Sequence, residues 1–183
     1  MRPEEAQEAL STIVATERAV QRATVRGTLV PTLVTWGIVW FIGYLASLWL
    51  APRALAVLWL ALVAVGLAIS VGAHTTYARR VRSPLGRRLG LSWVIGSSYL
   101  ALWSALLFPR DPLLASFVLV TGIMAAYVLM GLWMVPTLAA VGFAVTAVAV
   151  LGFLGGSTVF ALLVGLLGGG TLIATGLWLW WRS

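Results

Sequence analysis

The sequence predicts an all-α integral membrane protein, a six-transmembrane-helix bundle preceded by a cytoplasmic amphipathic helix. Of its 183 residues, 61% are hydrophobic and only 9% are charged, whereas a soluble domain carries about 25% charged residues. Six segments are apolar over the roughly 20 residues that a helix needs to cross about 30 Å of hydrocarbon. The arginines gather beside these segments, as residues that flank membrane spans do. A water-facing surface cannot be built from this composition.

Residues 1–27 are predicted to form the amphipathic helix. It begins near Pro3, carries Glu4 and Glu5 in its first turn and ends at Gly27. Three arginines recur every four residues along it: Arg18, Arg22 and Arg26. Its apolar stripe holds mostly Ala and Val, whereas interfacial anchors carry Trp, Phe and several Leu. We therefore favour packing on a protein surface, the alternative being a lipid-surface helix whose arginines contact anionic headgroups.

Residues 28–183 are predicted to form the six-span membrane domain. The spans are Thr28–Leu50, Ala54–Thr76, Leu89–Phe108, Leu113–Met134, Pro136–Leu154 and Thr158–Trp181, and the longest break between them is Tyr77–Arg88. Pro31 and Pro136 fall in first helical turns, which tolerate a missing N–H, and four further prolines fall in loops: Pro52, Pro84, Pro109 and Pro112. The spans should therefore be mostly continuous helices. At the glycine run of residues 168–170 we favour close helix packing over an unwound segment.

The arginines predict the orientation of the chain. The loop between the second and third spans holds five of them: Arg79, Arg80, Arg82, Arg87 and Arg88. These lie on the same side as Arg182 and the N-terminal helix, and the opposite loops hold only Arg53 and Arg110. By the positive-inside rule both termini are cytoplasmic. The arginine loop is interpreted as a topology determinant, with a docking site for an acidic partner or anionic lipid as the alternative.

We expect the membrane to be a bacterial inner membrane. Lys and Asn are absent from a chain rich in Ala, Leu, Val, Gly and Arg, and that usage is typical of a GC-rich bacterial genome. The net charge of +7 is assigned to the ends of the spans, so no nucleic-acid partner is expected.

Aromatic residues on one face of the first span are the candidate ligand-binding residues. Trp36, Trp40 and Tyr44 recur at i, i+4 and i+8, and Tyr127 lies at similar depth in the fourth span. Such a face inside a bundle can hold a flat apolar or cationic ligand. We favour tight packing, with the polar tips hydrogen-bonded to Ser or Thr of other helices, over such a ligand face.

The residues that most membrane chemistry requires are missing from the predicted spans. No Asp, Glu or Arg lies within one, and His74 lies only near the end of the second. Proton- or ion-coupled transport normally uses an intramembrane ionisable residue. One His and two distant groups of acids assemble no Ser–His–Asp triad and no metal site. We therefore expect no enzyme activity, no metal and no cofactor; the axial haem ligands available are His74 with Met130 or Met134.

The opening PEEAQEALSTI, the basic helix after it and the segment PTLVTWGIVWFIGYL at Pro31–Leu45 resemble a group of small multi-span bacterial membrane proteins with an N-terminal amphipathic helix. The resemblance extends to about Leu50. It implies an architecture, and it assigns neither an activity nor site residues.

Two functions remain open from the sequence. We favour a non-enzymatic protein that binds or passes a small neutral or hydrophobic molecule or a lipid, in the manner of a transporter or channel. The alternative is a membrane subunit of a larger transporter or sensory complex, which docks a partner through the N-terminal helix and the arginine loop. The expected partners are membrane lipids and either a second copy of the chain or a cytoplasmic protein. Small residues spaced by four, such as Gly122 and Ala126, fit close helix packing in either case.

Overall fold

The chain meets the central requirement of a membrane protein, since a backbone in hydrocarbon must satisfy its own hydrogen bonds and a helix does so within one segment. A computed structural model describes residues 25–80, 84–133 and 135–182, together with Gln7, Ser11, Thr12 and Ala15; side chains of residues 77–80 and 84–89 are not described. The described elements are η1 (Val25–Leu29), α2 (Val30–Ala46), α3 (Pro52–Arg80), α4 (Pro84–Leu107), α5 (Pro112–Trp133), α6 (Pro136–Leu154), α7 (Ser157–Leu163), η2 (Val164–Gly169) and α8 (Gly170–Arg182), where η marks a π-helical turn.

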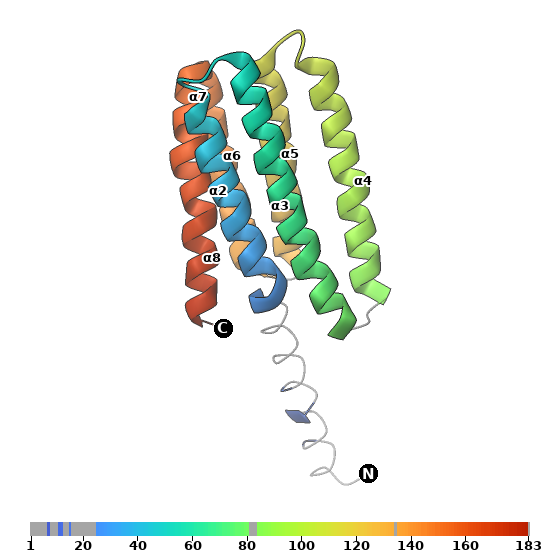
Figure 1. The fold of residues 1–183 in the computed structure, drawn as a ribbon. Coiled ribbons are helices and arrows are strands. Elements are labelled where there is room, and N and C mark those ends of the chain that lie inside the picture. The colour runs from blue at the N-terminus through green and yellow to red at the C-terminus, as the bar shows by residue number, and fades with distance from the viewer. Residues whose placement is uncertain are drawn as a thin grey trace.

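The prediction of six membrane-spanning helices is confirmed at the level of helix length and apolarity. Within the described residues, six helical stretches are long and apolar enough to cross a bilayer: Val25–Ala46, Pro52–Thr76, Gly90–Leu107, Pro112–Trp133, Pro136–Leu154 and Ser157–Arg182. They run alternately up and down, so that α2 begins and α8 ends at the same end of the bundle (Figure 1). The side of the membrane on which that end lies stays a prediction.

Three prolines that were expected in loops are the first residues of helices. Pro52, Pro84 and Pro112 begin α3, α4 and α5, because the first helical position has no use for a backbone N–H and the fixed φ of proline suits it. Helical structure therefore extends on both sides into the predicted break Tyr77–Arg88, through Arg80 and from Pro84 onwards. Residues 81–83 lie outside the described part of the chain.

The first span begins and ends earlier than predicted. Gly27 was expected to end the preceding helix, but it lies inside the π-helical turn η1, which leads directly into α2. Pro31 cannot donate a hydrogen bond to the carbonyl of Gly27, and its ring crowds that group, which is a physical reason for a wider turn there. At the other end, α2 ends at Ala46 and a turn follows, in which the Ser47 hydroxyl donates a hydrogen bond to the backbone carbonyl of Tyr44 at 2.6 Å.

Glycines bring the first span into close contact with the last. A Cβ atom on Gly37 would lie 2.8 Å from the carbonyl oxygen of Gly169, and a Cβ on Gly169 would lie 2.8 Å from the carbonyl oxygen of Gly37. The run of residues 168–170 is thus helical, and Gly169 within it packs against α2, in agreement with the packing interpretation. The link before α7 also depends on glycine, because Gly156 has a φ of 87°, which side chains disfavour.

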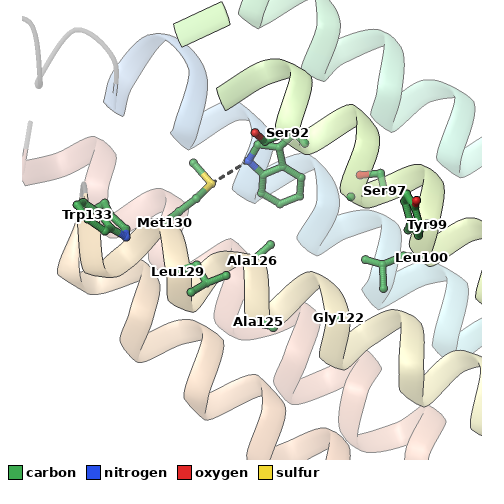
Figure 2. A pocket seen from close by; sticks show the side chains of 12 residues that line it. Ser92, Ser97, Tyr99, Leu100, Gly122, Ala125, Ala126, Leu129, Met130 and Trp133 are labelled. Atoms are coloured by element: carbon green, nitrogen blue, oxygen red, sulfur yellow. Dashed lines mark hydrogen bonds between the residues drawn. The ribbon is translucent and has the colours of Figure 1, made fainter. Parts of the chain in front are cut away.

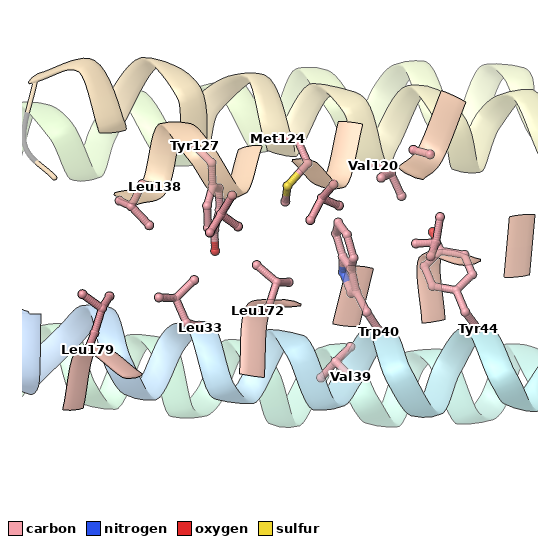
Figure 3. Packing of buried hydrophobic residues seen from close by; sticks show 14 of the residues in the cluster. Leu33, Val39, Trp40, Tyr44, Val120, Met124, Tyr127, Leu138, Leu172 and Leu179 are labelled. Carbon is pink, nitrogen blue, oxygen red and sulfur yellow. The ribbon is translucent and has the colours of Figure 1, made fainter. Parts of the chain in front are cut away.

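The hydrophobic core lies among α2, α5, α6 and the last span. Its fully buried side chains include Leu33 of α2, Met124 of α5, Val145 of α6 and Leu172 of α8. Figure 3 shows Leu33 and Trp40 of α2 facing Met124 and Tyr127 of α5 across this core. The helices α3 and α4 are more peripheral: the main neighbours of α3 are α2 and η1, and the main neighbour of α4 is α5. No residue of the α4 span is buried inside the described bundle.

Candidate functional site

The three aromatic residues of the first span form part of the packed interior. Trp40 and Tyr44 are 5% and 7% exposed, and their rings meet edge to face with centroids 6.2 Å apart. Trp36 is half-buried, and its indole N–H donates to the Ser70 hydroxyl of α3 at 3.1 Å. That bond is the interhelical contact expected of a packed aromatic residue with a polar tip.

Tyr44 is the centre of an aromatic cluster that joins three helices. Besides Trp40, its ring contacts Trp59 of α3 and Phe160 of α7, with centroid distances of 5.2 and 5.8 Å. Trp59 fits because its ring lies over Gly43, where a Cβ would come within 2.5 Å of the indole. The candidate face is therefore filled by neighbouring side chains in this structure.

Tyr127 faces the same core from the opposite side. It is 8% exposed, its hydroxyl points towards Leu33 and Leu172 in Figure 3, and its ring meets the Trp93 ring of α4 edge to face at 6.1 Å. The four candidate residues thus belong to one packed core, with Trp36 at its edge. Trp93, which contacts Tyr127, also lines a separate cavity between α4 and α5.

The candidate arginines are described only in part. Arg26 is exposed on the π-helical turn η1. Arg18, Arg22 and Arg82 lie outside the described residues, and Arg79, Arg80, Arg87 and Arg88 belong to the adjoining ends of α3 and α4, with side chains that are not described. Contact of these residues with a partner or with anionic lipid stays a prediction.

A cavity of about 500 Å³ lies between α4 and α5, within the range of roughly 300–1,000 Å³ typical of ligand sites. Helix α4 lines it with Ser92, Trp93, Gly96, Ser97, Tyr99 and Leu100, and α5 with Gly122, Ala125, Ala126, Leu129, Met130 and Trp133. We call it the α4–α5 groove; Figure 2 shows these side chains.

The groove results from the order of large and small residues on the two helices. Leu100 packs directly against Gly122, and the Trp93 indole N–H lies 2.8 Å from the Met130 sulfur, so large side chains space the helices at two levels. Between these levels, Gly96 has no atom within 4 Å of the place its Cβ would occupy. The cavity therefore lies at the level of Gly96, between the two contacts that space α4 and α5.

The lining of the groove suits an uncharged molecule or the uncharged part of a larger one. None of its residues is charged, and its polar groups are the hydroxyls of Ser92, Ser97 and Tyr99 together with the indole N–H groups of Trp93 and Trp133. Met130, considered above as a haem ligand, accepts the Trp93 N–H contact on α5, whereas His74 lies on α3 and Met134 is outside the described residues. In the described part of the chain, no three His, Cys, Asp or Glu residues gather where they could hold a metal ion.

The residues of the groove were not selected from the sequence as a site. Gly122 and Ala126 were recognised as a small-residue pair, but the pattern was assigned to helix packing. A usable signal is that small residues on two consecutive spans, Gly96 and Ser97 on one and Gly122 and Ala126 on the next, fall at matching depth.

Comparisons with known proteins leave the site to be judged by its geometry. No protein-family model matches the chain, and neither the curated proteins nor the solved structures contain a match.

Proposed function

We propose that this protein is a non-enzymatic membrane protein that binds a small hydrophobic molecule or lipid, taken up from the surrounding bilayer. The observation that carries the proposal is the α4–α5 groove, an apolar cavity between the peripheral helix α4 and the core helix α5. Passage of the molecule through or along the bundle, in the manner of a transporter, is the extension of this function that the sequence favours.

The position of the charges supports a ligand whose part within the membrane is apolar. Arg26, Arg53, His74 and Arg182 are the ionisable His and Arg residues in the six described spans, and each lies in the first or last turns of its span. Asp111, just before the start of α5, accepts a hydrogen bond from the Leu114 backbone N–H at 2.9 Å. These charges lie at helix ends, away from mid-membrane depth, where a charge is expensive.

The aromatic cluster around Tyr44 supplies a scaffold for such a site. Its rings and the reciprocal glycine contact between α2 and η2 make α2 and the last span a closely packed unit. Helix α4 is held mainly by α5, so it can change its distance from that unit at the lowest cost in packing. A ligand can then enter beside α4 without disturbing the core.

Native mass spectrometry of the protein, extracted gently from its host membrane, tests the proposal. We expect the folded chain to retain one hydrophobic molecule, of reproducible mass, through collisional activation that strips ordinary lipid. An unrelated six-span protein prepared in the same way is the control, because non-specific annular lipid would remain on both. The proposal is contradicted if the protein carries no bound molecule after release from the detergent, or if it carries the same lipids as the control.

A second candidate function is a membrane subunit of a larger complex. The observation that favours it is the peripheral position of α3 and α4, whose apolar side chains, such as Leu60 and Val94, are more than 60% exposed. A partner could cover this face as well as lipid can. A second polypeptide at fixed stoichiometry in the same spectrum would support this function in place of the first.

A further inference from the structure

The α4–α5 groove occupies one half of the membrane. On α4 it runs from Ser92 to Leu100 and on α5 from Gly122 to Trp133, a length of about 12–16 Å at 1.5 Å per residue. One leaflet contributes half of the hydrocarbon thickness, or about 15 Å. The groove thus matches the depth of a single leaflet, and its polar end lies where α4 begins and α5 ends.

The ends of the groove differ in chemistry. Leu100 packs against Gly122 and closes the groove at mid-membrane depth, where Tyr99 adds one hydroxyl to the lining. Ser92 and Trp133 lie at the other end, where a membrane–water interface favours Trp and hydroxyl groups. A molecule with one long apolar part and one polar end fits this gradient better than a compact apolar molecule does.

Positive charge is concentrated at the polar end. Arg87 and Arg88 belong to α4 and precede Ser92 by about one turn, and the same end of the bundle carries Arg26 and Arg182 (Figure 1). The whole chain has a net charge of +7. The complementary polar end of a ligand is therefore an anion.

The headgroup must supply most of the selectivity. Lipid tails are as apolar as the side chains of a membrane helix, so moving an acyl chain from the bilayer into the groove gains no hydrophobic energy. Arginine near an anionic lipid surface does provide attraction, of about five-fold in affinity for each residue. A neutral phospholipid lacks this contribution.

We propose that the α4–α5 groove holds one acyl chain of an anionic phospholipid from the leaflet at the arginine-rich end of the bundle. This inference rests on the proposed function and specifies its ligand and place. The acyl chain lies between Gly96 and Ala126, and the phosphate group lies beyond Ser92, on the side of Arg87 and Arg88.

The test uses the full chain in nanodiscs that contain phosphatidylglycerol and phosphatidylcholine in equal amounts, with identical acyl chains. Native mass spectrometry counts the lipids retained after release from the disc. Gly96→Phe fills the groove, and Gly72→Phe is its matched control, because neither glycine has an atom within 4 Å of its Cβ position but Gly72 lies on α3, away from the groove. Circular dichroism melting establishes that both variants remain folded.

We expect the wild type and Gly72→Phe to retain one phosphatidylglycerol, preferred over phosphatidylcholine by at least five-fold, the contribution of one arginine. Gly96→Phe should lose that lipid at least ten-fold. Equal retention of the two lipids overturns the anionic headgroup, and a retained lipid that Gly96→Phe leaves in place overturns the groove as its site. Both of those results leave the proposed function standing, whereas a wild type that retains no lipid overturns the function as well.

A second copy of the chain is the other occupant that the experiment can reveal. Dimers that Gly96→Phe abolishes and Gly72→Phe preserves, without a retained lipid, would show that the groove takes a helix of a neighbouring chain. That result contradicts the lipid proposal. Replacing Arg87 and Arg88 by Gln then provides an independent check, since the lipid proposal requires the phosphatidylglycerol preference to fall while the melting temperature stays unchanged.

Discussion

Substitution of Gly37 by alanine tests the packing that organises the bundle. The new methyl group would lie 2.8 Å from the carbonyl oxygen of Gly169 and 2.9 Å from the backbone nitrogen of Ile173. Both are backbone atoms of the last span, so neither can rotate away as a side chain would. Helix α2 and the last span must move apart.

The size of the effect follows from these distances. Ordinary van der Waals contact begins at 3.4 Å, so the helices separate by about 0.6 Å, and a gap of that size loses a quarter to a half of the dispersion energy of the contacts beside it. Overpacked positions cost about 1–3 kcal/mol, and the rigid neighbours place Gly37→Ala near the upper end, at about 3 kcal/mol.

Reversible unfolding in mixed detergent and SDS micelles, followed by circular dichroism, measures this loss. Gly72→Ala is the control, because its methyl group meets no atom within 4 Å and alanine is favoured over glycine in a helix by about 0.5–1 kcal/mol. We expect Gly37→Ala to unfold at a clearly lower SDS fraction and Gly72→Ala at the same or a higher one. The reasoning is refuted if the two variants unfold together.

Three further contacts are tested by substitution. In thermal melts, Tyr44→Ala should destabilise the protein by about 3–5 kcal/mol, because it empties the centre of an aromatic cluster. Tyr44→Phe should change the stability little, since no hydrogen bond joins the Tyr44 hydroxyl to the described residues. A large loss of stability from Tyr44→Phe would contradict this, because it would require a polar partner for that hydroxyl. Ser70→Ala should cost about 0.6 kcal/mol of stability, which is typical of an interhelical hydrogen bond in a membrane. In a double-mutant cycle with Trp36→Phe, the double variant should lose less stability than the sum of the two single variants. Additive losses would mean that the Trp36–Ser70 hydrogen bond is not formed. Asp111→Ala should cost about 1 kcal/mol by removing the cap on the Leu114 N–H, and an unchanged unfolding midpoint would exclude that cap.

The number of spans could be predicted because hydrocarbon thickness fixes the length of an apolar helix. Individual ends were less predictable, since they depend on local geometry. Pro31 follows a π-helical turn that carries the helix through Gly27, and Ser47 turns back to the carbonyl of Tyr44. Neither the π-helical turn nor the Ser47 hydrogen bond alters the hydropathy pattern from which the spans were predicted.

The candidate site was predictable only as a set of aromatic residues. Spacing places Trp36, Trp40 and Tyr44 on one face, but what that face meets depends on neighbours far away in the sequence. Here Gly169 lets the last span approach α2, and Phe160 and Trp59 close around Tyr44.

The groove was hidden for a related reason. Small residues on a membrane helix serve close packing or leave a cavity, and the outcome depends on whether the flanking large residues hold the helices together or apart. Leu100 against Gly122 and Trp93 against Met130 hold α4 and α5 apart around Gly96. One sequence does not reveal that pairing.

The most direct test of the account is photolabelling with a phospholipid that carries a diazirine at mid-chain. The protein is reconstituted with a trace of this lipid, irradiated, and mapped by peptide mass spectrometry. If the α4–α5 groove holds an acyl chain, labels will concentrate on residues 92–100 and 122–133, in excess of the exposed apolar stretch of α3 from Val57 to Val71. Labelling of α3 at the same density as the groove would contradict the account, because the lipid would then contact the groove no more than it contacts the exposed surface of the bundle.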